Sequence, residues 1–293
     1  MTGFSTLRGF LLAALALGFA SHAAASGPLT LDVYNPGATA IFPVSSVLVS
    51  GDKDAILVDA QFGKAQAQQV VNKVRASGKR LTTIYISHGD PDYYFGLETL
   101  TQAFPDAQVL ASAPTVEHIN TTKDAKLAFW GPQMGADAPG TLIVPQVLKG
   151  NTLSLEGHEL DVIGLNSQQP DRTFVWIPSI KAVVGGVVVA DNLHVWMADT
   201  QSPQSHKQWL STLKRIDSLQ PAIVVPGHYL GENDRSLSAV HFTRDYIKAF
   251  DEEAFKAKTS AQLIAAMKQR YPNLGEESSL ELSAKVAKGE MKW

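Results

Sequence analysis

Cysteine is absent from all 293 residues of the chain. Its absence excludes disulfide bridges, thiolate zinc sites, iron–sulfur clusters and cysteine nucleophiles together. Any metal ion would have to bind histidine, carboxylate, amide or water ligands. An excess of positive charge is also absent, because 25 Lys and Arg stand against 28 Asp and Glu, for a formal net charge of −3. A protein dedicated to nucleic-acid binding is therefore not expected.

The N-terminus carries the pattern of a secretory signal peptide. One positive charge, Arg8, precedes an apolar run over residues 9–20. The run is about 12 residues long, too short to cross a hydrocarbon core of roughly 30 Å. An A-x-A site then predicts cleavage before Ser26, which removes residues 1–25 and gives a periplasmic or secreted protein. An uncleaved anchor is the alternative, and no later apolar run is long enough to hold the mature chain in a membrane.

Strands and helices alternate along the mature chain, and no linker-like segment divides it. Residues 26–293 are therefore expected to form a single domain, with a helical segment over about 236–293. The apolar patterns predict strands over 44–49, 55–58, 81–87, 108–111, 142–144, 152–155, 159–163, 173–176, 182–189 and 222–225, and helices over 64–77, 96–104, 115–121, 204–218, 236–257 and 260–271, with a polar tail over 285–293. Mixed strands and helices in two similar halves favour a layered α+β sandwich over a doubly wound sheet.

Titratable residues follow three of the apolar strands, namely Asp59, His88 and His228. Loops at strand ends are where a rigid scaffold commonly carries a site. In the loop that begins at His88, Asp90 and Asp92 alternate with it, so an extended segment would point all three side chains to one face. One histidine and two carboxylates can form half of a site for a hard metal ion. The alternative is that the Asp side chains cap the following helix.

Residues 87–96, SHGDPDYYFG, resemble a variant of the S/T-H-x-H-x-D-H-x-x-G signature of the metallo-β-lactamase fold hydrolases. Residues 57–59 are similar to the strand that ends in the family's upstream Asp, and residues 226–228 resemble its late His after a buried strand. The order and rough spacing hold over about two-thirds of the chain. The resemblance implies a four-layer αββα sandwich with a metal cleft along one edge of its two sheets.

The ligand positions implied by the resemblance are only partly kept. His88, Asp92 and His228 match the family's ligand types, whereas Asp90 and Tyr93 stand where histidines belong. The two histidines with one of the two aspartates would give a mononuclear site with open positions, able to hold one zinc ion. Mn²⁺ or Fe²⁺ is also admissible, because the oxygen donors are harder than the family's set.

Four further positions bear on this implied site. Val187 stands where a bridging carboxylate is expected, so a dinuclear centre is not expected unless another carboxylate replaces it. Gln169 falls near another histidine position of the family and is a further candidate. Asp59 is implied to orient the metal loop without binding the ion. His194 follows the strand that should carry the bridging carboxylate and is a candidate contact for substrate or metal.

Three functions remain open at this point. The first is an exported hydrolase whose metal-bound water attacks an ester, amide, lactone or thioester bond of a small-molecule substrate, with Asp92 or Asp90 orienting the water. Tyr93 would then donate a hydrogen bond to the substrate oxyanion, or else only pack the loop. The second is a binding protein that keeps the fold without the dinuclear centre and without catalysis. The third is a redox or other metal function. Trp130, Trp196 and Phe95 either line an apolar substrate wall or pack in the core. The sequence does not fix the oligomeric state.

Overall fold

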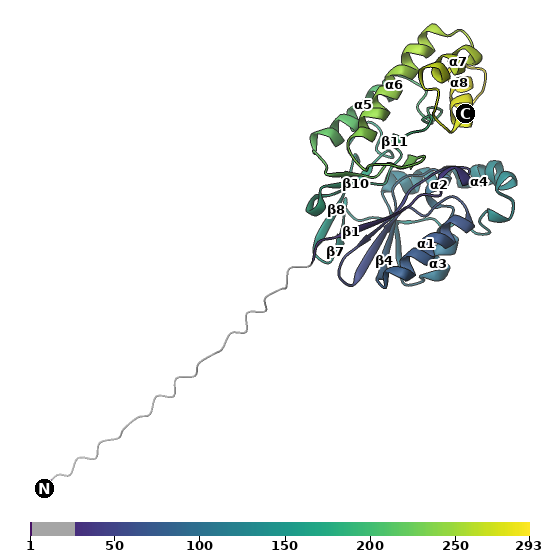
Figure 1. Cartoon of the computed structure of the whole chain (residues 1–293). Helices are drawn as coiled ribbons and strands as arrows, with labels where there is room; N and C mark the ends of the chain where they lie inside the picture. Colours follow the sequence, from purple (N-terminus) through teal and green to yellow (C-terminus); the bar gives the residue numbers. More distant parts are fainter. Residues whose placement is uncertain (2–26) are drawn as a thin grey trace.

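Six strands with alternating apolar residues build the first of two sheets. The computed structural model describes residues 27–293 and Met1, so the predicted signal peptide lies outside the described residues apart from Met1. The strands pair in the order β1-β2-β3-β4-β5-β6, antiparallel from β1 to β3 and parallel from β3 to β6 (Figure 1). They are β1 (Thr30–Tyr34), β2 (Ser46–Ser50), β3 (Asp54–Val58), β4 (Arg80–Ile86), β5 (Gln108–Ala111) and β6 (Gln146–Val147).

The second sheet has five strands in the order β12-β10-β9-β8-β7. They are β7 (Thr152–Leu155), β8 (His158–Ile163), β9 (Phe174–Ile177), β10 (Ala182–Val184) and β12 (Ile223–Val224). Two further short strands, β11 (Ala190–Asp191) and β13 (His228–Tyr229), pair with each other in parallel. Their pairing places His228 opposite Ala190.

Alternation along the strands decides which side chains lie between the sheets. Val49 and Val58 of the first sheet share one buried cluster with Val175 of the second. Leu48 and Leu57, each one residue away in sequence, belong instead to the cluster under the helices that cover the first sheet. This is the period-2 pattern of strands that are buried on both faces.

Helices cover the outer face of each sheet. They are α1 (Lys64–Ser77), α2 (Pro91–Tyr94), α3 (Leu97–Ala103), α4 (Ala113–Met134), α5 (Pro203–Ser218), α6 (Ser238–Lys256), α7 (Ser260–Arg270) and α8 (Glu277–Ala287). The helices from α1 to α4 pack on the first sheet, and those from α5 to α8 lie together over the second (Figure 1). The four-layer αββα sandwich expected from the sequence is therefore confirmed.

The structure corrects several predicted boundaries. Helix α4 continues from Ala113 to Met134, well beyond the predicted 115–121. The predicted strand over 182–189 ends at Val184, because Gly185 and Gly186 turn the chain with positive φ angles. The prediction of a polar tail from residue 285 is wrong, since Lys285 lies in the last turn of α8.

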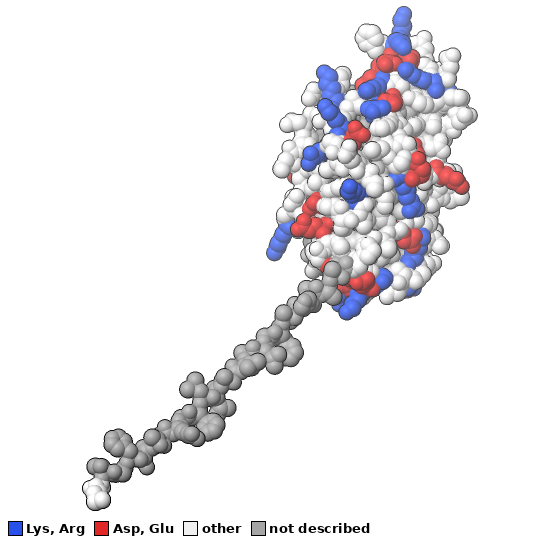
Figure 2. Space-filling view, turned by 60° about the vertical axis from the view of Figure 1, so that its left-hand side comes forward, with Lys and Arg blue, Asp and Glu red and all other residues white. Residues whose placement is uncertain are grey.

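The surface gathers no charge of one sign on the face that Figure 2 shows. Lys and Arg are interspersed there with Asp and Glu, as the nearly balanced composition leads one to expect. In the part of the chain that the structure describes, no helix combines the length and apolar character needed to cross a membrane.

Gly186 is required where β10 turns away from the second sheet. Its φ is +81°, and a Cβ built on it would lie 2.0 Å from the carbonyl oxygen of Thr173. Its N–H donates to Ser87 Oγ at 2.7 Å, so the turn is also tied to the end of β4. Any larger residue would have to displace backbone at this point.

We expect Gly186→Ala to lower the free energy of unfolding by about 3 kcal/mol or more, because a left-handed backbone and a backbone clash act together. Gly150→Ala is the matched control, since Gly150 has the same φ of +81° with nothing within 4 Å of the built Cβ. It should lose only about 1–2 kcal/mol. Urea unfolding of both variants measures the difference, and equal losses would contradict the role of the close contact.

Candidate functional site

Asp59 fastens the strand ends at the edge of the sandwich. It follows β3 with a φ of +69° and is fully buried. Its carboxylate accepts from the backbone N–H of Ser87 at 2.8 Å and from Ser87 Oγ at 2.7 Å. Because Ser87 Oγ also accepts from Gly186 N–H, the ends of β3, β4 and β10 are joined through one hydroxyl. Burial raises the pKa of Asp59 to about 7, against the lowering effect of the Ser87 hydrogen bonds.

The loop after β4 carries the predicted ligands. Helix α2 begins directly after Asp90, which has extended backbone in the N-cap position but makes no side-chain capping bond. The interpretation of Asp90 as a helix cap is therefore wrong. Its carboxylate turns instead toward His88 and Lys126. Asp92, one residue into α2, turns toward His228 on the other side of the site.

His88 and Asp90 form the first of two pairs. His88 Nε2 lies 3.1 Å from Asp90 Oδ2, and His88 Nδ1 lies 3.1 Å from the carbonyl oxygen of Asp171. Both partners are acceptors, so only the doubly protonated ring satisfies both. Burial lowers the pKa of His88, but the charge and hydrogen bond of Asp90 outweigh it and raise the pKa. Burial alone would raise the pKa of Asp90, yet His88, His118 and Lys126 hold it well below its usual range.

His228 and Asp92 form the second pair, with Tyr93 attached. His228 Nε2 lies 2.6 Å from Asp92 Oδ2, and His228 Nδ1 lies 3.2 Å from the Tyr93 hydroxyl. Burial and the charge of Asp92 raise the pKa of Tyr93 well above its usual value, so the hydroxyl keeps its proton. A hydroxyl that donates to Nδ1 leaves the ring proton on Nε2, where it faces the carboxylate.

The ring of Tyr93 packs against the histidine of each pair. Its centroid lies 5.3 Å from that of His88 and 5.5 Å from that of His228, with edge-on geometry toward both. Over residues 27–293, no three His, Asp or Glu side chains gather as a metal ion would need. The four predicted ligands are thus brought to one region but sorted into two pairs. A metal at either pair would have two protein ligands, where catalytic zinc uses three.

Two positively charged side chains, Lys126 and Arg172, also lie near these carboxylates. Lys126 Nζ lies 3.5 Å from Asp90 Oδ1. Arg172 is 7% exposed, its guanidinium lies 4.4 Å from the Trp209 ring centroid, and its Nε and Nη2 have no partner among the described residues. Burial lowers the pKa of Arg172, and the charges of Asp199 and Asp90 oppose that shift. Two positive side chains would repel a dication here, so this donor set does not fit the metal centre that the resemblance implies.

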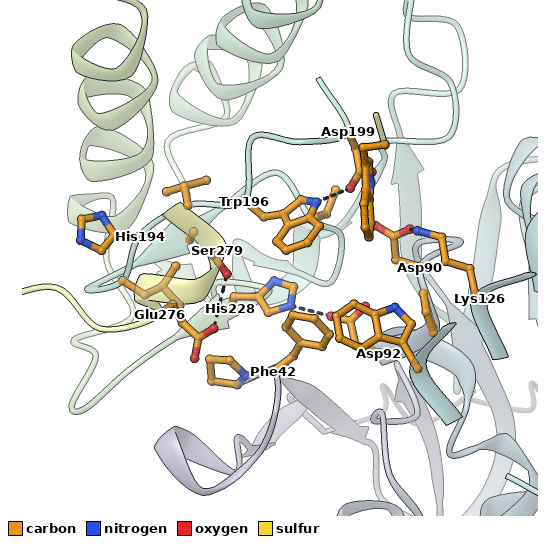
Figure 3. A pocket seen from close by; sticks show the side chains of 18 of the residues that line it. Phe42, Asp90, Asp92, Lys126, His194, Trp196, Asp199, His228, Glu276 and Ser279 are labelled. Carbon is orange, nitrogen blue, oxygen red and sulfur yellow. Dashed lines mark hydrogen bonds and ion pairs between the residues drawn. The ribbon is translucent and has the colours of Figure 1, made fainter. Parts of the chain in front are cut away.

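A pocket opens beside the second pair, with about 670 Å³ of empty space including the solvent at its mouth (Figure 3). Five aromatic side chains line it: Phe42, Trp130, Trp196, Trp209 and Trp293. Four carboxylates reach it as well: Asp90, Asp92, Asp199 and Glu276. The residues from 276 onward belong to the segment after α7, so the C-terminal segment supplies one wall.

Some of the other residues singled out from the sequence line the pocket, and others do not. His194 does line the pocket, but it is 1% exposed and its Nδ1 is bonded to the Tyr246 hydroxyl at 3.0 Å. Gln169 is not among the pocket residues, and its carbonyl oxygen accepts from the N–H of Arg172 in the loop before β9. Trp130 and Trp196 line the pocket, and Trp130 also belongs to the buried core under the first sheet. Phe95 is not among the pocket residues and packs in that core.

Sequence reasoning missed seven charged or aromatic side chains of this region: Phe42, Lys126, Arg172, Asp199, Trp209, Glu276 and Trp293. Arg172 lay three residues from a predicted ligand position, so a search for a replacement cation there could have found it. Asp199 accepts the indole N–H groups of Trp196 and Trp293, both at 2.6 Å. The tryptophans lie 97 positions apart in the sequence, so no local pattern signals this contact.

The architecture and the position of the site at the sheet edge define a metallo-hydrolase-type sandwich. The family model for the "Metallo-beta-lactamase superfamily" matches residues 40–228, more than half of the chain. The chain therefore belongs to the metallo-β-lactamase superfamily, whose members are generally metal-dependent hydrolases and usually bind zinc.

Solved structures agree on the fold. The chain is similar to a metallo-beta-lactamase from Pontibacter korlensis, with a TM-score of 0.56 and 19% identity over 76% of this chain and 96% of that one. It is also similar to DIM-1 metallo-beta-lactamase, with a TM-score of 0.53 and 19% identity over 76% and 98%. Among curated proteins, the uncharacterized protein YobT of Bacillus subtilis (strain 168) is 34% identical over 73 residues. That match spans 25% of this chain and 31% of YobT.

Asp59 makes stability depend on pH. Its native pKa of about 7 lies above the unfolded value of 3.8, so the native state binds more protons between these values and stability falls as pH rises through them. We expect a loss of about 2–3 kcal/mol from pH 5 to pH 8, at 1.36 kcal/mol per pKa unit. Asp59→Asn, which keeps an acceptor for Ser87, should flatten this dependence in urea unfolding at each pH. An unchanged slope in the variant would assign the pH dependence to other groups.

Proposed function

We propose that this chain is a metallo-β-lactamase superfamily protein that binds a small molecule in the edge pocket without the superfamily's metal centre. The observation that carries the proposal is that each histidine is paired with its own aspartate, while the Tyr93 ring packs edge-on against both histidines. A pocket with apolar walls and a few convergent polar groups is the usual form of a small-molecule site.

The hydrogen-bond partners of His88 and His228 support the absence of a metal centre. Each ring nitrogen of His88 lies 3.1 Å from an oxygen acceptor, so an ion bound at either nitrogen would have to displace that contact. His228 would have to move its proton from Nε2 and give up the hydrogen bond from Tyr93 before Nε2 could bind an ion. Val187 adds no ligand at the position where the family carries its bridging carboxylate.

The competing function is the metal-dependent hydrolysis that is general in the superfamily. It would need His88, His228 and one aspartate to share a single zinc, manganese or iron ion that activates water against an ester, amide, lactone or thioester bond. Such an ion requires the two histidines to leave their separate aspartate pairs and converge on one point. Metal analysis separates the two functions directly.

Purified protein incubated with Zn²⁺, Mn²⁺ or Fe²⁺ and desalted should retain less than about 0.1 ion per chain, because no described group offers three ligands. The melting temperature should not rise with added metal. Elemental analysis of the wild type, His88→Ala and His228→Ala makes the measurement, with His241→Ala as the surface-histidine control. About one ion per chain that both site variants lose and the control keeps would establish the competing function.

We also propose export of the protein. The support is the sequence of residues 8–25, with one charge, a short apolar run and an A-x-A site. Expression of the full chain in a Gram-negative host should give periplasmic protein whose N-terminus is Ser26. Ala25→Arg should block cleavage, because the signal peptidase accepts small residues there. Cytoplasmic protein that keeps residue 1 would refute export.

A further inference from the structure

The charged side chains that line the pocket are mostly acidic. Asp90, Asp92, Asp199 and Glu276 stand there against one lysine, Lys126. The charge of Lys126 is already engaged, with Nζ 3.5 Å from Asp90 Oδ1. An anionic ligand would therefore meet carboxylates without finding an available cation among the described lining residues. A cationic ligand would meet several complementary charges.

Lys126 itself shows how this pocket holds an ammonium group. Its Nζ lies 5.1 Å from the Trp293 ring centroid and beside Asp90, so an aromatic face and a carboxylate share one cation. A cation within about 6 Å of an indole face is attracted by the ring quadrupole, more strongly when water is excluded. The same two kinds of group recur deeper in the pocket, where no lysine is present.

Two carboxylates flank His228 in Figure 3, Asp92 on one side and Glu276 on the other. Asp92 is 6% exposed, and only its Oδ2 has a hydrogen-bond partner among the described residues. Among the described residues, the carboxylate of Glu276 accepts one long hydrogen bond, 3.4 Å from Ser279 Oγ. Burial raises the pKa of Glu276, with His228 and Ser279 opposing the shift. Both carboxylates thus retain acceptor capacity in a site where their charge is poorly solvated.

Aromatic rings stand close to these carboxylates. The ring centroid of Phe42 lies 5.0 Å from that of Trp130 and 6.1 Å from that of Trp196. The three rings come from segments far apart in the chain and meet at the pocket. The indole N–H of Trp196 is directed to Asp199, so its polar edge is satisfied and its face is left for an apolar contact.

We propose that the pocket binds a small organic cation, an ammonium group on an apolar or aromatic body. The ammonium group lies at the carboxylate of Glu276, and the body packs against Phe42, Trp130 and Trp196. This inference rests on the proposed function, since it names the ligand class of the same pocket. It follows from the surplus of acceptors, the aromatic walls and the engaged state of Lys126.

Three probes of similar shape test the ligand class by calorimetry at constant ionic strength: phenethylammonium, 2-phenylethanol and 3-phenylpropionate. They share a phenyl ring and a short chain and differ in charge. Phenethylammonium should bind at least about tenfold more tightly than the neutral alcohol, because a desolvated cation gains from both the rings and the carboxylates. The anionic probe should bind more weakly than the alcohol. Equal or tighter binding of the anion overturns the inference and leaves the small-molecule pocket standing.

Glu276→Gln tests the assigned position, because the amide keeps an acceptor for Ser279 and removes the charge. It should weaken phenethylammonium about tenfold and leave the alcohol within about twofold. Glu277→Gln is the matched control, as Glu277 is exposed and paired with Lys268 at 2.8 Å. Equal effects of the two variants would refute the assignment. Failure of all three probes to bind at about 10 mM would overturn the proposed ligand class. Metal analysis of the same protein tests separately whether the proposed metal-free function also fails.

Discussion

The carboxylate of Asp59 joins the two sheets at the edge where the pocket opens. It holds Ser87 by backbone and side chain, and Ser87 in turn holds the Gly186 turn of the second sheet. Because β4 is fixed at this residue, the next residues leave the sheet in one direction and place His88 and Asp90 together. A buried acid with such partners costs desolvation energy, yet it positions every later part of the site.

Cationic side chains lie close to the carboxylates of the site. His88, His118 and Lys126 contact Asp90, and His228 contacts Asp92 while accepting or donating a hydrogen bond at the Tyr93 hydroxyl. The superfamily usually binds zinc. This chain has Asp90 and Tyr93 at two positions where the family has histidines. The exchange removes two histidine ligands and adds one negative charge, which the nearby cations offset. The fold remains that of the superfamily.

Much of the fold could be predicted because its signals are local. Helix α1 was predicted at its observed bounds, since Val70, Val71 and Val74 repeat at helical spacing and Gly78 ends it. The strand-end rule also placed His88 and His228 at one edge. Their pairing with two different aspartates could not be predicted, because it depends on how the side chains pack after folding. The contribution of Trp293 depends on a contact with Asp199 across 94 residues, which no window of sequence contains.

The clustering of indoles around the pocket has an optical consequence. The chain has five tryptophans, and four of them, at 130, 196, 209 and 293, line the pocket. The fifth, Trp176, lies in β9 of the second sheet. Intrinsic fluorescence of the native protein therefore reports mainly on one cavity. A change in emission that leaves circular dichroism unchanged would mark an event inside that cavity, observed without any attached dye.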